Sequence, residues 1–202
     1  MKKQLFDDFI RSHSQLIEKI RNAAATLHEE VRQTYDGHPY IHHLSMVADA
    51  AMRYGYEVID NESDVIPVIF AAFFHDSIED ARMTYNDVIR EAEKYMSSEQ
   101  AYTAAEIVYA VTNDKGRTRA ERAGEKYYAG IRATPFAPFV KLCDRYANMS
   151  YSFKNAKEPN NHMRRVYKSE WPHSIGSITV ETDDKRFALS SDLKADIEAL
   201  FD

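Results

Sequence analysis

The feature that most constrains the fold of this chain is the segment from Asp64 to Ile78, which is apolar on nearly every side. A helix that is hydrophobic all round must be surrounded by other elements, so we expect this segment to run through the centre of the molecule. Six glycines and six prolines among 202 residues leave few turn formers for a many-stranded sandwich or barrel. The chain is therefore expected to be an all-α, single-domain helical bundle.

Apolar residues elsewhere recur at three- and four-residue steps, which is typical of amphipathic helices. This spacing predicts a long helix from Leu5 to Val31, a second from Ile41 to Tyr54 and a later one from Pro135 to Phe153. The stretch from Ile178 to Leu189 contains the β-prone run Ile-Thr-Val-Glu-Thr, and we expect a short strand or an extended loop there.

Composition excludes several classes of function. The formal net charge of −6 and a pI near 5.8 give no global attraction to nucleic acid or to an anionic membrane, so neither is expected as a partner. The longest apolar run, Val65 to Phe74, is interrupted by Pro67 and is too short to span a bilayer. The single cysteine, Cys143, rules out an internal disulfide and suits a reduced, cytoplasmic protein.

Polar residues at the end of the central apolar segment are the first indication of chemistry. His75 and Asp76 follow it directly, and Glu79 and Asp80 come four residues after each of them, one helical turn along. Acids this close repel one another unless a cation, a shared proton or basic residues intervene, and a divalent metal would both neutralise them and activate water. The alternative is that the helix simply emerges into water at this point.

A second buried acid favours the metal. Asp144 follows the mainly apolar stretch 139–143, which contains one charged residue, Lys141, and Asn148 lies one turn further on the same predicted helix face. Two histidines and two aspartates can hold a borderline divalent metal and leave positions open for water and substrate oxygens. The candidate ligands are His43, His75, Asp76 and Asp144.

Four strings of this sequence are similar to the motifs of one enzyme family and occur in that family's order. They are Gly37–His43 followed by Val47-Ala48 (G-x-P-Y-I-x-H-P-x-x-V-A), His75–Asp80 (H-D-x-x-E-D), Val111–Lys115 (V-T-D-D-K) and Lys141–Asn148 (K-L-A-D-[RK]-L-x-N). Over residues 23–148 the chain thus resembles the HD-domain metal-dependent phosphohydrolases of the RelA/SpoT group, most closely its Mesh1-like small alarmone hydrolases.

The resemblance implies an activity and a set of site residues. The activity is hydrolysis of ppGpp or pppGpp, the alarmones of the stringent response, to GDP or GTP and pyrophosphate. It implies Mn²⁺, or another divalent metal, bound by the four candidate ligands, with Glu79 and Asp80 positioning and deprotonating the attacking water. The substrate would be bound by Arg32, Lys115 and Asn148. Residues 1–158 would form the hydrolase core, and residues 159–202 a C-terminal helical extension packed on it.

The sequence also departs from the family pattern. Gln33 stands where a lysine is usual beside Arg32, Leu44 replaces a proline, and Ala81 replaces a threonine. These departures keep a second interpretation open, an HD phosphohydrolase for another nucleotide such as a nucleoside monophosphate or NADPH. A third is a non-catalytic nucleotide-binding module, against which the intact Glu79-Asp80 pair argues.

Overall fold

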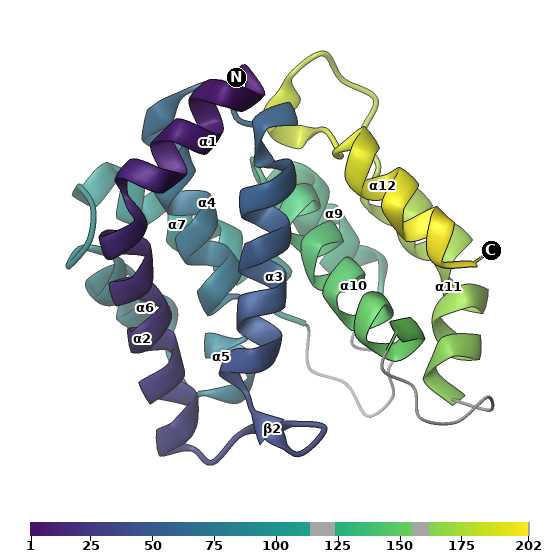
Figure 1. Cartoon of the computed structure of the whole chain (residues 1–202), viewed down its shortest axis with the longest axis horizontal. Coiled ribbons are helices and arrows are strands. Elements are labelled where there is room, and N and C mark those ends of the chain that lie inside the picture. Colours follow the sequence, from purple (N-terminus) through teal and green to yellow (C-terminus); the bar gives the residue numbers. More distant parts are fainter. Residues whose placement is uncertain (114–123, 155–161, 202) are drawn as a thin grey trace.

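The computed structural model describes residues 1–113, 124–154 and 162–201, and these form an all-α bundle, as expected (Figure 1). The elements are α1 (Lys3–Ser12), α2 (Ser14–Glu30), β1 (Thr34–Tyr35), β2 (His38–Pro39), α3 (Ile41–Tyr54), η1 (Gly55–Glu57), α4 (Glu62–Phe74), α5 (Ser77–Asp80), α6 (Tyr85–Ala92), α7 (Ser98–Val111), α9 (Glu125–Ala133), α10 (Ala137–Lys154), α11 (His162–Ile178), η2 (Lys185–Phe187), α12 (Ser191–Glu198) and η3 (Ala199–Phe201).

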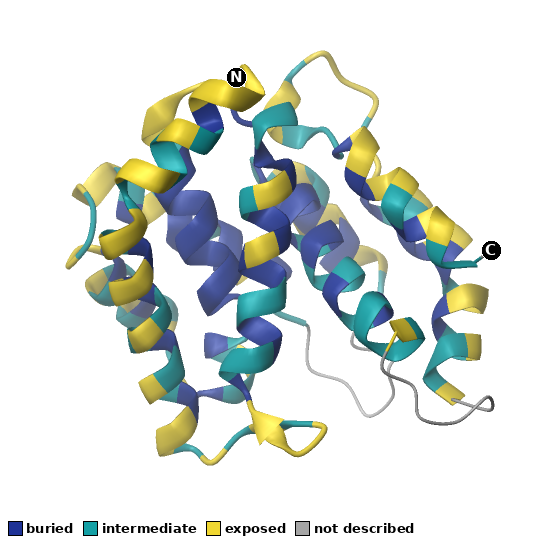
Figure 2. Ribbon diagram, viewed as in Figure 1, coloured by how far each residue is buried: buried dark blue, intermediate teal, exposed yellow. Residues whose placement is uncertain are grey.

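Helix α4 occupies the centre, as its all-apolar sequence predicts. Every residue from Val65 to Phe74 is buried, and α4 packs against α2, α3, α7 and α10 (Figure 2). Pro67 lies inside this helix and has no N–H to donate to the carbonyl of Ser63, one turn earlier. Gln100 of α7 supplies the missing donor, because its Nε2 lies 2.7 Å from that oxygen.

The central helix ends earlier than expected. It stops at Phe74, and His75 and Asp76 form a turn before the short helix α5 begins. The prediction of a continuous helix to Ile78 is therefore wrong. Successive side chains on a continuous helix diverge by about 100°. The break, where Asp76 adopts φ −97° and ψ 4°, instead lets the two consecutive polar side chains approach one point.

The first predicted helix is also interrupted, at His13. The Ser12 hydroxyl lies 2.8 Å and the His13 ring nitrogen Nδ1 2.9 Å from the carbonyl of Phe9, so local side-chain bonds compete with the regular helix there. As a result α1 runs along η1, while α2 packs on α3 and α4.

A tight hairpin precedes α3 and was not expected from the sequence. Strands β1 and β2 pair antiparallel, with Thr34 opposite Pro39 and Tyr35 opposite His38. The turn residues Asp36 and Gly37 both have positive φ, at 48° and 81°, which is the geometry of a two-residue hairpin. The hairpin lies where α3 begins (Figure 1).

The C-terminal helices α11 and α12 pack against α10. The carboxylate of Glu57 accepts hydrogen bonds from Ser190, Ser191 and the backbone N–H of Asp192, so an anion caps the start of α12. Residues 179–184 form neither helix nor strand, so the extended-loop alternative holds for that stretch. The domain boundary expected at residue 158 falls outside the described residues. Within the described ranges, no helix combines the length and apolar character that crossing a membrane requires.

Candidate active site

Four polar side chains from three parts of the fold meet near the end of α4. His43 Nε2 of α3 lies 3.3 Å from His75 Nε2 and 3.4 Å from Asp144 Oδ1 of α10. Asp76 Oδ2 lies 3.0 Å from His75 Nε2 and 3.6 Å from His43 Nε2. The residues that the sequence indicates as metal ligands are therefore neighbours, although they are spread over about half of the chain.

The hydrogen bonding of His75 tests whether a cation fits this cluster. His75 Nδ1 lies 2.9 Å from the carbonyl oxygen of Ala72, which can only accept, so Nδ1 carries the proton and Nε2 presents its lone pair to the cluster. A lone pair 3.0 Å from a carboxylate oxygen needs a proton or a metal between them. Ligand atoms of His43, His75 and Asp144 all lie within 4.8 Å of one another, a mixed imidazole and carboxylate set that fits a divalent cation.

The pKa values of the cluster show how strongly it attracts positive charge. Burial alone would lower the pKa of His75, but the carboxylates of Asp76 and Asp144 outweigh burial and raise it to about 9. Burial also acts to raise the pKa of Asp76, yet the two adjacent imidazoles hold it below its ordinary value. In the metal-free protein the cluster therefore holds an extra proton, which a divalent cation would displace.

Asp144 is fixed through both of its carboxylate oxygens. Lys141 Nζ donates to Oδ2 over 2.9 Å, and Asn148 Nδ2 donates to Oδ1 over 2.6 Å. Burial would raise the pKa of Asp144, but Lys141 and His43 keep it well below the usual range. Asp144 is thus a permanent anion whose Oδ1 faces the two histidines.

Tyr40 joins the cluster to Asp80. Its hydroxyl lies 2.6 Å from Asp76 Oδ2 and 3.1 Å from Asp80 Oδ2, and its single proton can serve only one of them at a time. Gln33 Nε2 donates to the same oxygen of Asp80 over 3.2 Å. Burial and the nearby Asp76 raise the pKa of Asp80, which suits a group that accepts a proton during a reaction.

Glu79 is oriented differently from the other acids. It is exposed, and its carboxylate accepts hydrogen bonds from the side-chain amide of Asn113 at 3.0 and 3.2 Å. Because the helix is interrupted between α4 and α5, Glu79 does not lie one turn after His75 on a single helix face, as the spacing suggested. Lys115, expected to bind substrate, lies outside the described residues.

The other two expected substrate-binding residues occupy different settings. Arg32 is exposed just after α2 and adopts φ 57°, a backbone conformation that favours glycine. Its N–H bonds the carbonyl of Glu29 and the next N–H bonds that of His28, which completes a Schellman motif. Asn148 instead faces the cluster, and both ends of its side-chain amide are hydrogen-bonded within the protein.

Sequence reasoning missed several residues that support the site. Tyr40 and Lys141 stand inside the quoted motifs, so their contacts with Asp76 and Asp144 could have been sought there. Tyr35 lies outside those motifs. Its hydroxyl donates to Asn148 Oδ1 over 3.0 Å, across 113 positions of sequence, and only the folded chain brings the two together.

Comparison with known proteins gives sequence relatives and a structural neighbour. No family model matches this sequence. Guanosine-3′,5′-bis(diphosphate) 3′-pyrophosphohydrolase MESH1 of Danio rerio is 31% identical over 134 residues, 66% of this chain and 67% of that protein. The MESH1 proteins of Mus musculus and Homo sapiens are each 28% identical over 138 residues, 67% of this chain and 68% of theirs.

The structural neighbour is described as "A metazoan ortholog of SpoT hydrolyzes ppGpp and plays a role in starvation responses". It matches with a TM-score of 0.61 and 20% sequence identity, and the match covers 92% of this chain and 93% of that chain. The structural likeness therefore covers more of the chain than the 134 residues aligned by sequence. At 20% identity, the match shows that the two proteins share a fold.

Proposed function

Because this chain belongs to the MESH1 family of guanosine-3′,5′-bis(diphosphate) 3′-pyrophosphohydrolases, we propose that it hydrolyses ppGpp and pppGpp. In this reaction water adds to the phosphorus bonded to O3′, the P–O3′ bond breaks, and O3′ leaves with a proton. The products are pyrophosphate and GDP or GTP. The observation that carries the proposal is the cluster of His43, His75 and Asp144, with Asp76 against both imidazoles.

The proposed cofactor is one divalent cation, taken to be Mn²⁺. His43, His75 and Asp144 would hold it, because their ligand atoms lie within 4.8 Å of one another, and Asp76 Oδ2, 3.0 Å from His75 Nε2, would complete the set. When bound there, a divalent cation polarises a phosphoryl oxygen and makes water a stronger nucleophile at neutral pH. Lys141 and Tyr40 contribute by keeping Asp144 and Asp76 anionic and oriented.

Asp80 is proposed to deprotonate the attacking water, and Glu79 to orient it. Asp80 is close enough to the cluster to receive the proton of a water bound beside it, and its raised pKa matches that role. Gln33 donates to the oxygen Oδ2 of Asp80 over 3.2 Å, which leaves the second oxygen of Asp80 for the water. Glu79, held by Asn113 at the rim, would orient the water or the leaving pyrophosphate.

Substrate recognition is assigned to the segment after α2 and to the residues after Asn113. Arg32 is exposed and free to lie along the guanine base, and Lys115 would neutralise phosphate charge. Gln33 in place of a lysine removes one cation from this region, and that substitution is the reason to test other nucleotides alongside ppGpp.

The test is a product analysis with the Mn²⁺-loaded protein. ppGpp, pppGpp, NADPH and nucleoside monophosphates are incubated separately and the products identified by ion-exchange chromatography and ³¹P NMR. We expect pyrophosphate and GDP in equal amounts from ppGpp. Intact ppGpp together with release of phosphate from NADPH or a monophosphate would replace the alarmone assignment by another nucleotide. Binding of nucleotides with no product from any of them would indicate a non-catalytic module.

A further inference from the structure

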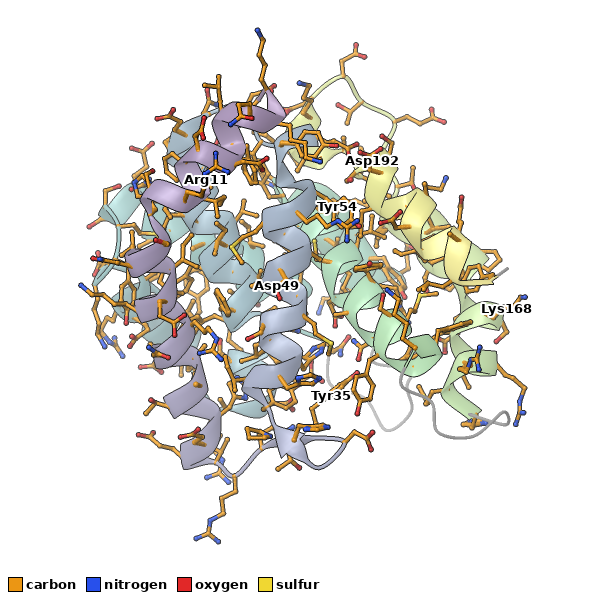
Figure 3. All side chains as sticks on the ribbon, viewed as in Figure 1. Arg11, Tyr35, Asp49, Tyr54, Lys168 and Asp192 are labelled. Atoms are coloured by element: carbon orange, nitrogen blue, oxygen red, sulfur yellow. The ribbon has the colours of Figure 1, made fainter. Side chains whose placement is uncertain are left out.

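Tyr35 contacts two of the proposed metal ligands although it lies on the hairpin, outside the helices that carry them. Its ring stacks on the imidazole of His43, with centroids 4.8 Å apart and planes 13° from parallel. Figure 3 shows Tyr35 at the end of the molecule where α3 begins, close to α10. The side chain is half-buried, so one part of the ring is committed to packing against His43.

The hydroxyl of Tyr35 reaches the second ligand through Asn148. It donates to Asn148 Oδ1 over 3.0 Å, and Asn148 Nδ2 donates in turn to Asp144 Oδ1 over 2.6 Å and to the Asp144 carbonyl over 3.1 Å. Both ends of the Asn148 amide are therefore used inside the protein. The oxygen that Asn148 holds is the one that faces His43 Nε2 at 3.4 Å.

The other carboxylate oxygen of Asp144, Oδ2, cannot easily replace Oδ1 as the atom that faces His43. Oδ2 is paired with Lys141, so rotation of the carboxylate would break an ion pair as well as the bond from Asn148. An Asn148 that bound substrate would have to give up its bonds to Asp144 or Tyr35. The contacts thus favour a role for Asn148 in orienting Asp144 over direct contact with the nucleotide.

We propose that Tyr35 is a positioning residue of the metal centre. It orients Asp144 through Asn148 and holds the ring of His43 in place by stacking on it. A side chain of the hairpin thereby increases the affinity of the site for the metal. The inference rests on the proposed function, because it assumes that His43 and Asp144 bind the metal. Partners that orient metal ligands typically change metal affinity by about 10- to 100-fold when they are removed. The side chain that does so here comes from a loop and not from the helical scaffold.

Calorimetric titration of Mn²⁺ into the metal-free, full-length protein tests the proposal. Tyr35→Phe keeps the ring on His43 and removes only the hydroxyl, and Asn148→Leu removes the amide at similar size. We expect each variant to bind Mn²⁺ about tenfold or more weakly. The double variant should bind no more weakly than Asn148→Leu alone, because the hydroxyl acts through the amide.

Tyr151→Phe is the matched control. Tyr151 packs edge-on against Tyr35, with centroids 5.0 Å apart. Within the part of the chain that the structure describes, its hydroxyl donates to Asp36 in the same hairpin and to none of the proposed ligands. This variant should bind Mn²⁺ like the unmodified protein. Saturating Mn²⁺ should also restore kcat in Tyr35→Phe and Asn148→Leu with KM for ppGpp unchanged, which a structural or substrate-binding role would not give.

The outcomes separate this proposal from the function on which it rests. Equal Mn²⁺ affinity for Tyr35→Phe and the unmodified protein would overturn the role of Tyr35 and leave the metal centre standing. Additive losses in the double variant would overturn the route through Asn148. A raised KM in Asn148→Leu that excess Mn²⁺ does not correct would return Asn148 to the substrate. If the unmodified protein binds no divalent metal, the metal centre itself is wrong.

Discussion

The side-chain amide of Gln33 donates a hydrogen bond to Asp80 Oδ2 over 3.2 Å. The residue that departs from the usual family lysine therefore touches the proposed general base. Gln33→Leu removes this donor at similar size, and we expect kcat on ppGpp to fall about tenfold, the effect of losing one hydrogen bond to a charged group. Metal content, measured by inductively coupled plasma mass spectrometry, should not change. An unaltered kcat would remove Gln33 from the orientation of Asp80.

Gln33→Lys serves as the companion variant, since it restores a donor and adds a positive charge. We expect activity on ppGpp to be equal or better. Burial and Asp76 raise the pKa of Asp80, and an ammonium beside it would lower that pKa. The base then stays deprotonated to lower pH, so the acidic limb of the kcat/KM profile should shift to lower pH. A shift to higher pH would contradict the assignment of Asp80 as the base.

Replacing a proposed ligand should remove the metal. The purified protein should contain about one divalent ion per chain, and His75→Ala or Asp144→Ala should lose it, because one of four ligands contributes a large share of the binding energy. His42→Ala is the control, because His42 precedes His43 and its ring packs near His38 and Tyr151. Full metal occupancy in both ligand variants, or its loss in His42→Ala, would refute the assigned set.

Glu79→Gln separates metal binding from chemistry. The amide keeps the size of the side chain and can still accept a hydrogen bond from Asn113, but it carries no negative charge and offers only one acceptor oxygen with which to orient the attacking water. We expect kcat to fall by about 100-fold or more with metal content retained. Asn113→Ala, which frees Glu79 without neutralising it, should have a smaller effect. An unchanged rate in Glu79→Gln would exclude Glu79 from the mechanism.

Arg32 combines an unfavourable backbone with a side chain that the proposed function uses. Its φ of 57° disfavours a residue with a Cβ, so Arg32→Gly should leave stability unchanged or raise it by up to about 1 kcal/mol. The same variant should raise KM for ppGpp about tenfold, because it removes binding shared by the ground and transition states.

Arg82→Gly provides the comparison for Arg32, because Arg82 is also exposed and has a φ of 63°. Urea denaturation should show a similar stability change in the two variants, whereas steady-state kinetics should show a raised KM only for Arg32→Gly. A KM that does not change in Arg32→Gly would remove Arg32 from substrate binding.

The fold follows from the sequence where periodicity and burial act together. Helix α3 has the bounds expected from its apolar spacing, and α4 is central because no face of it is polar. The breaks at His13 and His75 were missed, since they depend on hydrogen bonds and packing that spacing does not encode. The hairpin at Asp36-Gly37 could have been predicted, because an Asp-Gly pair favours positive φ at both turn positions.

The resemblance of the chain to its family is confirmed by the MESH1 relatives, whereas the arrangement around the ligands needed the structure. His43, His75 and Asp144 could be named from the order of motifs, and they do cluster. The link from Tyr35 through Asn148 to Asp144 joins residues from opposite parts of the chain. The direction of Glu79 depends on the break after α4. Neither of these has a signature in local sequence.

The central claim is that one metal held by this cluster enables hydrolysis of ppGpp. The most direct measurement titrates Mn²⁺ into the metal-free protein and follows pyrophosphate release from ppGpp by coupled assay, with GDP measured in the same samples. The account predicts that the rate rises with metal occupancy, stops rising at about one ion per chain, gives pyrophosphate and GDP in equal amounts, and is absent in Asp144→Ala. Pyrophosphate release at the same rate in chelator-treated protein, or in Asp144→Ala, would contradict it.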